Sequence, residues 1–179
     1  MNIFLKILWW TSAFIIVWAM VGYPVFLIVL DKILKKPSNA KNKEYTPTVT
    51  VLVVAHNEEK VIKKKLENLL TVDYPSESYA VMVTSDCSTD ATNSIVETFV
   101  KAHPENNISI HKTVHHGGKT NAQNEAVKLI NSELVIMTDA NCYFDKNAVR
   151  EIASSFYDES IKYVCGATIF TNSVSSVEA

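Results

Sequence analysis

The chain has 179 residues, with 17 basic and 19 acidic side chains and a formal net charge of −2. A charge balance this close to zero excludes the basic surface that nucleic-acid binding requires, so we expect no nucleic-acid partner. The hydrophobic fraction of 47% is typical of a folded protein rather than a disordered one. The three cysteines, Cys87, Cys142 and Cys165, are too few and too widely spaced for a disulfide scaffold, which indicates reduced, cytosolic thiols.

The N-terminal part contains an uncharged apolar stretch that is long enough to cross a membrane. No charged residue occurs between Ile7 and Leu30, and a helix of this length spans about 36 Å against a hydrocarbon core of about 30 Å. A signal-peptide core is shorter and ends at a small-residue cleavage site. We therefore predict one transmembrane helix over residues 1–31, kinked at Pro24 and held in the lipid bilayer of the cell membrane. A signal peptide and a buried core helix are the alternatives.

Lysines are distributed unequally around this stretch. Lys6 alone precedes it, whereas five lysines follow it: Lys32, Lys35, Lys36, Lys41 and Lys43. Because positive charge favours the cytoplasmic side, we expect the rest of this single-pass chain to face the cytoplasm. Composition predicts a lysine-rich linker over residues 32–46, a compact domain over 47–170 and a polar tail over 171–179.

Apolar runs of strand length alternate with segments of helical periodicity from residue 48 onward. The predicted strands cover residues 48–55, 79–84, 108–113, 133–138 and 162–170. Continuously apolar strands are typical of a sheet that is covered on both faces. The alternation therefore predicts an α/β fold, with a mostly parallel sheet and helices on both of its faces.

The first helix is expected between the first two strands. Asn57 is a residue type that caps helices, and the apolar residues that follow it recur at helical spacing up to Leu70. Four lysines are expected on the solvent-facing side of this helix: Lys60, Lys63, Lys64 and Lys65.

Four polar clusters begin where predicted strands end, at residues 55–58, 85–86, 115–119 and 138–141. In an open parallel sheet, ligands bind in the crevice beyond the carboxyl ends of the strands. Turn chemistry alone explains any single cluster. Taken together the clusters favour a ligand site, because Asp86 and Asp139 both directly follow strands.

Two carboxylates that face one crevice repel each other unless a cation lies between them. Mg²⁺ or Mn²⁺ accepts carboxylate, amide and phosphate oxygens together, and Asp139 and Asn141 can present oxygens to one such ion. Lys119 can neutralise phosphate charge, and the backbone at Gly117 and Gly118 can approach a ligand closely because these residues lack a Cβ.

Other sites are less consistent with the spacing. A P-loop would require glycine at position 113, where the chain has Thr113, and no G-x-G-x-x-G motif follows the first strand. Zinc ligation by the remaining histidines and one cysteine lacks paired spacing; these residues are His111, His115, His116 and Cys142. His56 either lines the pocket or is a turn histidine with satisfied ring nitrogens.

The segments VTVLVVAHNEEKVI, VTSDCSTDAT, GGKTNAQNEAV and LVIMTDANCYFDKNAVREI, in this order and spacing, resemble glycosyltransferase family 2 with its GT-A fold. The likeness runs from about Thr48 to about Ala167 and is strongest to membrane-anchored bacterial members that make polysaccharides or glycolipids. It implies inverting, metal-dependent transfer of a sugar from a nucleotide-diphosphate sugar, first of all a UDP-sugar, to a polysaccharide or lipid-linked acceptor.

The resemblance also implies roles for individual residues. The D-x-D position for Mg²⁺ or Mn²⁺ holds Asp139 and Asn141, so a neutral amide replaces the second aspartate. Asp86 matches the residue that binds the base, and Lys119 and Gly118 match the loop against nucleoside and phosphates. The first-strand motif that touches the nucleotide corresponds to Ala55, His56, Asn57 and Glu58.

The general base of the family is expected downstream of Ala179, and no residue of this chain is nominated for it. We therefore interpret the chain as the donor-binding part of such an enzyme, either a fragment or a truncated gene product. The alternative is a nucleotide-sugar-binding fragment or partner subunit without catalytic competence. A nucleotidyltransferase is disfavoured, because the sequence AHNEE after the first strand is acidic rather than glycine-rich and basic.

Overall fold

The computed structural model describes residues 2–34, 41–167 and 169. It divides into two compact units, Met1–Asn39 and Ala40–Ala179.

The described part of the first unit is a continuous helix from Ile3 to Ile33, long and apolar enough to cross a membrane. It consists of α1 (Ile3–Val17), a π-helical turn η1 (Trp18–Gly22) and α2 (Tyr23–Ile33). The widened turn ends at Gly22, two residues before Pro24, which lacks the N–H that regular helical bonding would use. A signal sequence near the N-terminus passes the same test of length and composition.

The two hydroxyl residues of α1 bond within the helix. Thr11 Oγ1 donates to the carbonyl of Ile7 at 2.9 Å, and Ser12 Oγ donates to the carbonyl of Leu8 at 2.8 Å. Because a hydrocarbon environment offers no water, this internal bonding is what a lipid-exposed helix requires of its polar groups.

The second unit contains, in its described residues, a parallel four-stranded sheet in the order β3-β2-β1-β4. The strands are β1 (Val49–Ala55), β2 (Tyr79–Ser85), β3 (Ile108–Lys112) and β4 (Leu134–Asp139). The chain runs from β1 outward to β3 and then returns to the other side of β1 for β4. The carboxyl ends of β1 and β4 therefore flank the point where the strand order reverses, which is where open α/β sheets bind ligands.

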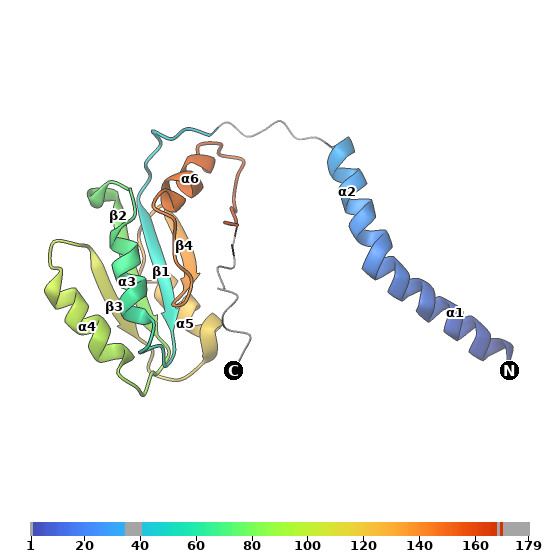
Figure 1. The fold of residues 1–179 in the computed structure, drawn as a ribbon, viewed down its shortest axis with the longest axis horizontal. Coiled ribbons are helices and arrows are strands. Elements are labelled where there is room, and N and C mark those ends of the chain that lie inside the picture. The colour runs from blue at the N-terminus through green and yellow to red at the C-terminus, as the bar shows by residue number, and fades with distance from the viewer. Residues whose placement is uncertain (1, 35–40, 168, 170–179) are drawn as a thin grey trace, which may run out of the picture. The chain divides into compact units, whose positions relative to one another are not determined.

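Helices cover both faces of this sheet, as the sequence predicts. The helices of this unit are α3 (Ile62–Leu70), α4 (Thr92–Ala102), α5 (Gly118–Val127) and α6 (Ala148–Ser155), with a short 3₁₀ turn η2 (Ser76–Ser78) before β2. Figure 1 shows α3 and α4 side by side on the sheet, where their apolar residues share a core with α6. α5 packs on β1 and β2 from the opposite face.

Side-chain alternation in β1 explains how one strand serves both layers. Val51 and Val53 belong to the core beneath α3, α4 and α6, whereas the fully buried Leu52 lies outside that cluster and faces α5. α5 contributes Ala122 and Ala126, both 0% exposed, and these small residues allow close helix–sheet packing.

The fifth predicted strand is wrong for those of its residues that the structure describes. Residues 162–167 and 169 form no strand, and Tyr163 and Ile169 are more than 80% exposed. An apolar run becomes a strand only where a neighbour supplies hydrogen bonds, and β4 pairs with β1 alone in the described sheet. Residues 168 and 170 lie outside the described part.

The predicted solvent face of α3 is wrong at one position. Lys60, Lys63 and Lys64 are exposed, but the side chain of Lys65 is 0% exposed. Lys65 lies on the same side of α3 as Ile62, Leu66 and Leu69, which are buried in the core. The prediction from charge was therefore wrong for Lys65, because helical spacing puts position 65 on the inner face of α3.

The C-terminal part of the predicted linker contacts α6. The Asn42 N–H donates to the Ser154 carbonyl at 3.3 Å, and Lys43 Nζ lies 2.6 Å from a carboxylate oxygen of Glu151. Residues 35–40 of the linker and residues 171–179 of the predicted tail lie outside the described part.

Candidate functional site

An open cleft of about 250 Å³ lies at the carboxyl ends of β1 and β4. The register of the sheet explains its position, since Val54 of β1 pairs with Asp139 of β4, and Asp86 directly follows β2. The cleft is lined by Val54, His56, Glu58, Asp86, Lys119, Asp139, Ala140 and Asn141. All four predicted polar clusters thus contribute residues to the cleft, and Lys119 is the contribution of the cluster 115–119.

Asp86 is the buried acid of the site, with only 2% of its surface exposed. Its Oδ1 accepts hydrogen bonds from the Gly117 N–H at 3.1 Å and from the Thr113 hydroxyl at 3.3 Å. Burial by itself raises the pKa of this carboxyl, but the Gly117 N–H, the adjacent His116 and the Thr113 hydroxyl outweigh it, so the pKa lies below its ordinary value. The carboxylate is therefore ionised at neutral pH.

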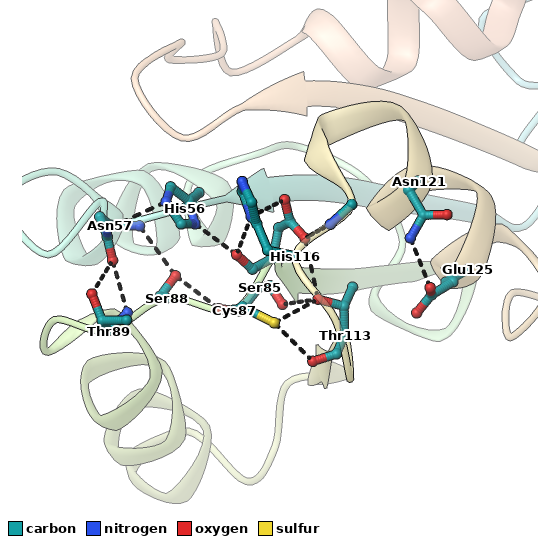
Figure 2. A network of polar contacts seen from close by, with 12 residues as sticks. His56, Asn57, Ser85, Cys87, Ser88, Thr89, Thr113, His116, Asn121 and Glu125 are labelled. Carbon is teal, nitrogen blue, oxygen red and sulfur yellow. Dashed lines mark hydrogen bonds and ion pairs between the residues drawn. The ribbon is translucent and has the colours of Figure 1, made fainter.

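Two histidines flank Asp86. His116 Nδ1 lies 2.9 Å from Asp86 Oδ2, and His56 Nδ1 donates to the Asp86 carbonyl at 2.6 Å. The two imidazole rings lie with their centroids 4.6 Å apart, and Figure 2 shows them beside each other. His56 thus lines the cleft and also satisfies one ring nitrogen, which combines the two readings that the sequence leaves open.

His116 belongs to the predicted polar cluster 115–119, but sequence reasoning assigned it no individual role in the nucleotide site. It precedes Gly117 in a loop whose position depends on the Asp86 carboxylate. Metal-binding atoms of His56, Asp86 and His116 lie within 4.8 Å of one another. This cluster differs from the histidine set weighed on the sequence, because its members come from three separate loops that only folding brings together.

Asn57 positions loops instead of capping α3, which corrects the capping prediction. The backbone of Asn57 has φ 57°, and its Oδ1 accepts hydrogen bonds from the N–H groups of Thr89 and Asp90 at 2.8 and 3.4 Å. α3 begins at Ile62 without a side-chain cap. Asn57 thereby fastens the loop after β1 to the loop after β2, because asparagine tolerates a left-handed backbone and accepts with its side chain.

Some of the predicted nucleotide-binding residues line the cleft, and the others lie behind it or beside it. Glu58, at the cleft, is held by its N–H, which donates to the Thr92 hydroxyl at 2.8 Å. Ala55 is buried, and its carbonyl accepts from the Asp86 N–H at 2.9 Å. Gly118 has φ 78° at the start of α5. Ala55, Asn57 and Gly118 are not among the residues that line the cleft.

Asp139 and Lys119 form an ion pair across the cleft. Lys119 Nζ lies 2.5 Å from Asp139 Oδ1, and each side chain is about half exposed. Ala140 is buried behind the turn, whereas Asn141 is exposed and lines the cleft with Asp139. The Lys119 ammonium is thus the positive charge beside the Asp139 carboxylate. Carboxylate and amide oxygens are also ligands that Mg²⁺ and Mn²⁺ accept.

This arrangement, a parallel sheet with a polar cleft at its switch point, is GT-A-like. The Glycosyl transferase family 2 model matches residues 50–177. The chain therefore belongs to glycosyltransferase family 2, and the resemblance drawn from its motifs is confirmed.

The chain is similar to enzymes that use sugars. It is 30% identical over 115 residues to the beta-monoglucosyldiacylglycerol synthase of Nostoc sp., covering 64% of this chain and 25% of the synthase. Its structure is similar to the mannosyltransferase PcManGT from Pyrobaculum calidifontis in complex with GDP-Man and Mn²⁺, with a TM-score of 0.74 and 30% identity, covering 83% and 44% of the two chains.

The S. aureus TarS structure with UDP-GlcNAc is also similar, with a TM-score of 0.55 and 33% identity over 63% of this chain and 31% of TarS. The chain thus spans about a quarter of the glycolipid synthase and less than half of either structure.

Proposed function

We propose that this chain supplies the donor-binding part of a glycosyltransferase that takes a nucleotide-diphosphate sugar, first of all a UDP-sugar. The observation that carries the proposal is the cleft in which Asp86, Lys119 and Asp139 meet at the switch point of the sheet. Structures similar to this chain hold GDP-Man and UDP-GlcNAc. The acceptor in our proposal is a polysaccharide or a lipid-linked molecule, in keeping with the glycolipid synthase among the relatives.

Asp86 is proposed to bind the nucleobase. Its Oδ1 already accepts two hydrogen bonds within the protein, while Oδ2 faces His116. An N–H of the base can approach Oδ2 from the cleft, and a bond to an ionised acceptor is about twice as strong as a neutral one. His56 and Glu58 line the same part of the cleft and are proposed to contact the nucleoside.

Lys119 is proposed to bind the diphosphate. Its ammonium now pairs with Asp139, but phosphate oxygens entering the cleft would offer it a second, more highly charged partner. Neutralising phosphate charge favours departure of the nucleoside diphosphate when the bond to the sugar breaks. We propose that Gly118, at the start of α5, lets the backbone come close to the phosphates.

Asp139 and Asn141 are the residues proposed to hold Mg²⁺ or Mn²⁺. Their side chains fit such an ion, since both line the cleft and offer hard oxygen ligands, one charged and one neutral. When bound, the ion would act as a Lewis acid that stabilises charge on the leaving diphosphate. The neutral Asn141 predicts weaker ion binding than two carboxylates would give.

Anchoring and completion of the enzyme are further parts of the proposal. We propose that helix Ile3–Ile33 crosses the cell membrane once, with the second unit on the cytoplasmic side, because lysines are concentrated after the helix. We assign no general base among the described residues. In this proposal the general base that deprotonates the acceptor hydroxyl in inverting transfer comes from outside the described residues. A nucleotide-sugar binder without transfer is the second candidate.

Titration of the detergent-solubilised full chain with UDP, GDP and their sugars, with and without Mn²⁺, tests the proposal. We expect calorimetric binding of one nucleotide family that strengthens when Mn²⁺ is present. Absence of binding for every nucleotide by a folded chain would refute it. Measuring the transfer of labelled sugar from the nucleotide to an added acceptor in the same sample distinguishes a transferase from a protein that only binds the donor.

A further inference from the structure

Lys65 is the largest fully buried side chain of the protein among the described residues, with 0% of its surface exposed. It extends from α3 towards the turn that carries Asp139 and Asn141. A buried ammonium carries a desolvation cost that an apolar residue of similar size would avoid. Ile62, Leu66 and Leu69 are the apolar residues that the same face of α3 buries in the core.

The Lys65 ammonium has two hydrogen-bond acceptors and lies over one aromatic ring. Its Nζ donates to the Thr138 hydroxyl at 3.2 Å and to the Cys142 carbonyl, and it lies 4.1 Å from the centre of the Phe144 ring. Thr138 directly precedes Asp139, and Cys142 directly follows Asn141. The Lys65 ammonium thus joins Thr138 and Cys142, the residues on either side of the turn Asp139–Asn141. The Cys142 N–H closes this turn by donating to the Asp139 carbonyl at 3.3 Å.

A second residue of α3 strengthens this attachment. Asn68 lies one turn beyond Lys65, on the same side of the helix. Its Oδ1 accepts from the Phe144 N–H at 2.7 Å, and its Nδ2 donates to the Phe144 carbonyl at 2.9 Å. The segment after the turn is therefore fixed to α3 at residues 142 and 144, while the turn itself remains at the edge of the cleft.

Charge supports the same interpretation. Burial lowers the pKa of Lys65 to about 8, while Cys142 and Asp139 act in the opposite direction. The side chain consequently remains largely protonated at neutral pH, with all of its donors available. The exposed Lys119 approaches Asp139 from the cleft, whereas Lys65 holds the turn from inside the domain.

We propose that Lys65 is a positioning residue, which holds the turn from Asp139 to Asn141 in the geometry that binds a divalent ion with the diphosphate. This inference rests on the proposed function of the cleft. It assigns Lys65 no contact with the ion or the donor. Instead, its bonds to Thr138 and Cys142 limit the movement of both oxygen-bearing residues, as groups behind a metal ligand commonly do.

The test compares Lys65→Met, which keeps an unbranched chain of similar volume, with Lys64→Met on the exposed side of α3. In the full chain with UDP present, we expect Lys65→Met to weaken Mn²⁺ binding by about 10- to 100-fold and to leave UDP binding without metal unchanged. If Lys65 acted only as a positive charge near the ion, its removal would instead strengthen Mn²⁺ binding. Stronger or unchanged binding in Lys65→Met would overturn the proposal.

Hydrogen exchange gives a readout that does not depend on nucleotide binding. We expect the amides of residues 139–142 to exchange at least about tenfold faster in Lys65→Met, with wild-type rates in Lys64→Met. Unchanged exchange in a folded Lys65→Met would refute the tether. If the wild type binds no nucleotide at all, the proposed function fails, while exchange still decides whether Lys65 holds the turn.

A second variant covers the case in which Lys65→Met does not fold. Thr138→Val removes one of the two oxygen acceptors and keeps the shape of the side chain and the lysine itself. We expect a smaller loss of Mn²⁺ affinity than in Lys65→Met, below about tenfold, because the Cys142 carbonyl still holds the lysine ammonium. Wild-type affinity in this variant would contradict the proposal.

Discussion

Replacing Asp86 by asparagine is the sharpest test of the nucleotide site, because it removes the charge and preserves the shape. The amide oxygen can occupy the Oδ1 position and keep the bonds from the Gly117 N–H and the Thr113 hydroxyl. The amide nitrogen then takes the place of Oδ2, which faces His116. A nucleobase N–H that approaches this position would meet a donor instead of an ionised acceptor.

The loss can be given a magnitude. A hydrogen bond to a charged group contributes about 1.5–3 kcal/mol, which corresponds to a rise of about 10- to 150-fold in the Kd for UDP. Calorimetry on the full chain with Mn²⁺ measures it directly. Glu105→Gln is the matched control, since it removes one carboxylate in the exposed loop before β3, at the opposite edge of the sheet. A folded Asp86→Asn protein with wild-type UDP affinity would refute the assignment.

The same substitution predicts a change in the pH dependence of stability. The pKa of Asp86 in the folded protein lies below its ordinary value of 3.8, so the unfolded chain takes up a proton at a higher pH than the native state does. The stabilisation by Asp86 is therefore complete above that value and is lost as pH falls through the folded pKa. Urea unfolding should show wild type and Asp86→Asn differing at pH 7 and converging in strong acid. A constant difference would contradict this linkage.

Four further substitutions test the metal turn and the core. Asp139→Asn should abolish the Mn²⁺ dependence of donor binding, and an unaltered Mn²⁺ titration would count against the assignment. Asn141→Asp should tighten Mn²⁺ binding roughly tenfold, since each added ligand charge raises affinity; no change would mean that position 141 is not a ligand. Leu52→Ala should lower the free energy of unfolding by about 2–5 kcal/mol, measured in urea, because Leu52 is fully buried against α5. Its register partner Met137, which is 53% exposed, should tolerate alanine with a loss under about 1 kcal/mol, and equal losses would show that α5 does not cover Leu52.

Relatives of known structure hold Mn²⁺ with GDP-Man or hold UDP-GlcNAc, whereas this chain has the neutral Asn141 beside Asp139. In our proposal, the tether from Lys65 to Thr138 and Cys142 limits the movement of this weaker ligand pair. Pre-organised ligands lose less conformational freedom on binding, so rigidity can compensate for missing charge.

The local chemistry of the chain was sufficient to predict its regular elements. Each of the runs that begin near Val49, Tyr79, Ile108 and Leu134 forms a strand within one or two residues of its predicted bounds. The run near Val49 is almost continuously apolar and is buried on both faces, so a parallel sheet with covering helices follows from the residues themselves, whereas the edge strands β3 and β4 stay partly exposed. The placement of polar residues at strand ends followed from the same pattern.

Other features depended on which groups folding brings together. Residues 162–167 are apolar enough for a strand but have no neighbour to pair with, and Lys65 is charged yet buried because partners from β4 and the following segment surround its ammonium. His116 reaches Asp86 from a loop 30 positions away. Hydrophobic pattern is a property of neighbours along the chain, and so it was determined by the sequence alone. A buried charge and the backbone of a strand both need hydrogen-bond partners from residues distant in the chain. Only the tertiary structure decides whether those partners are present.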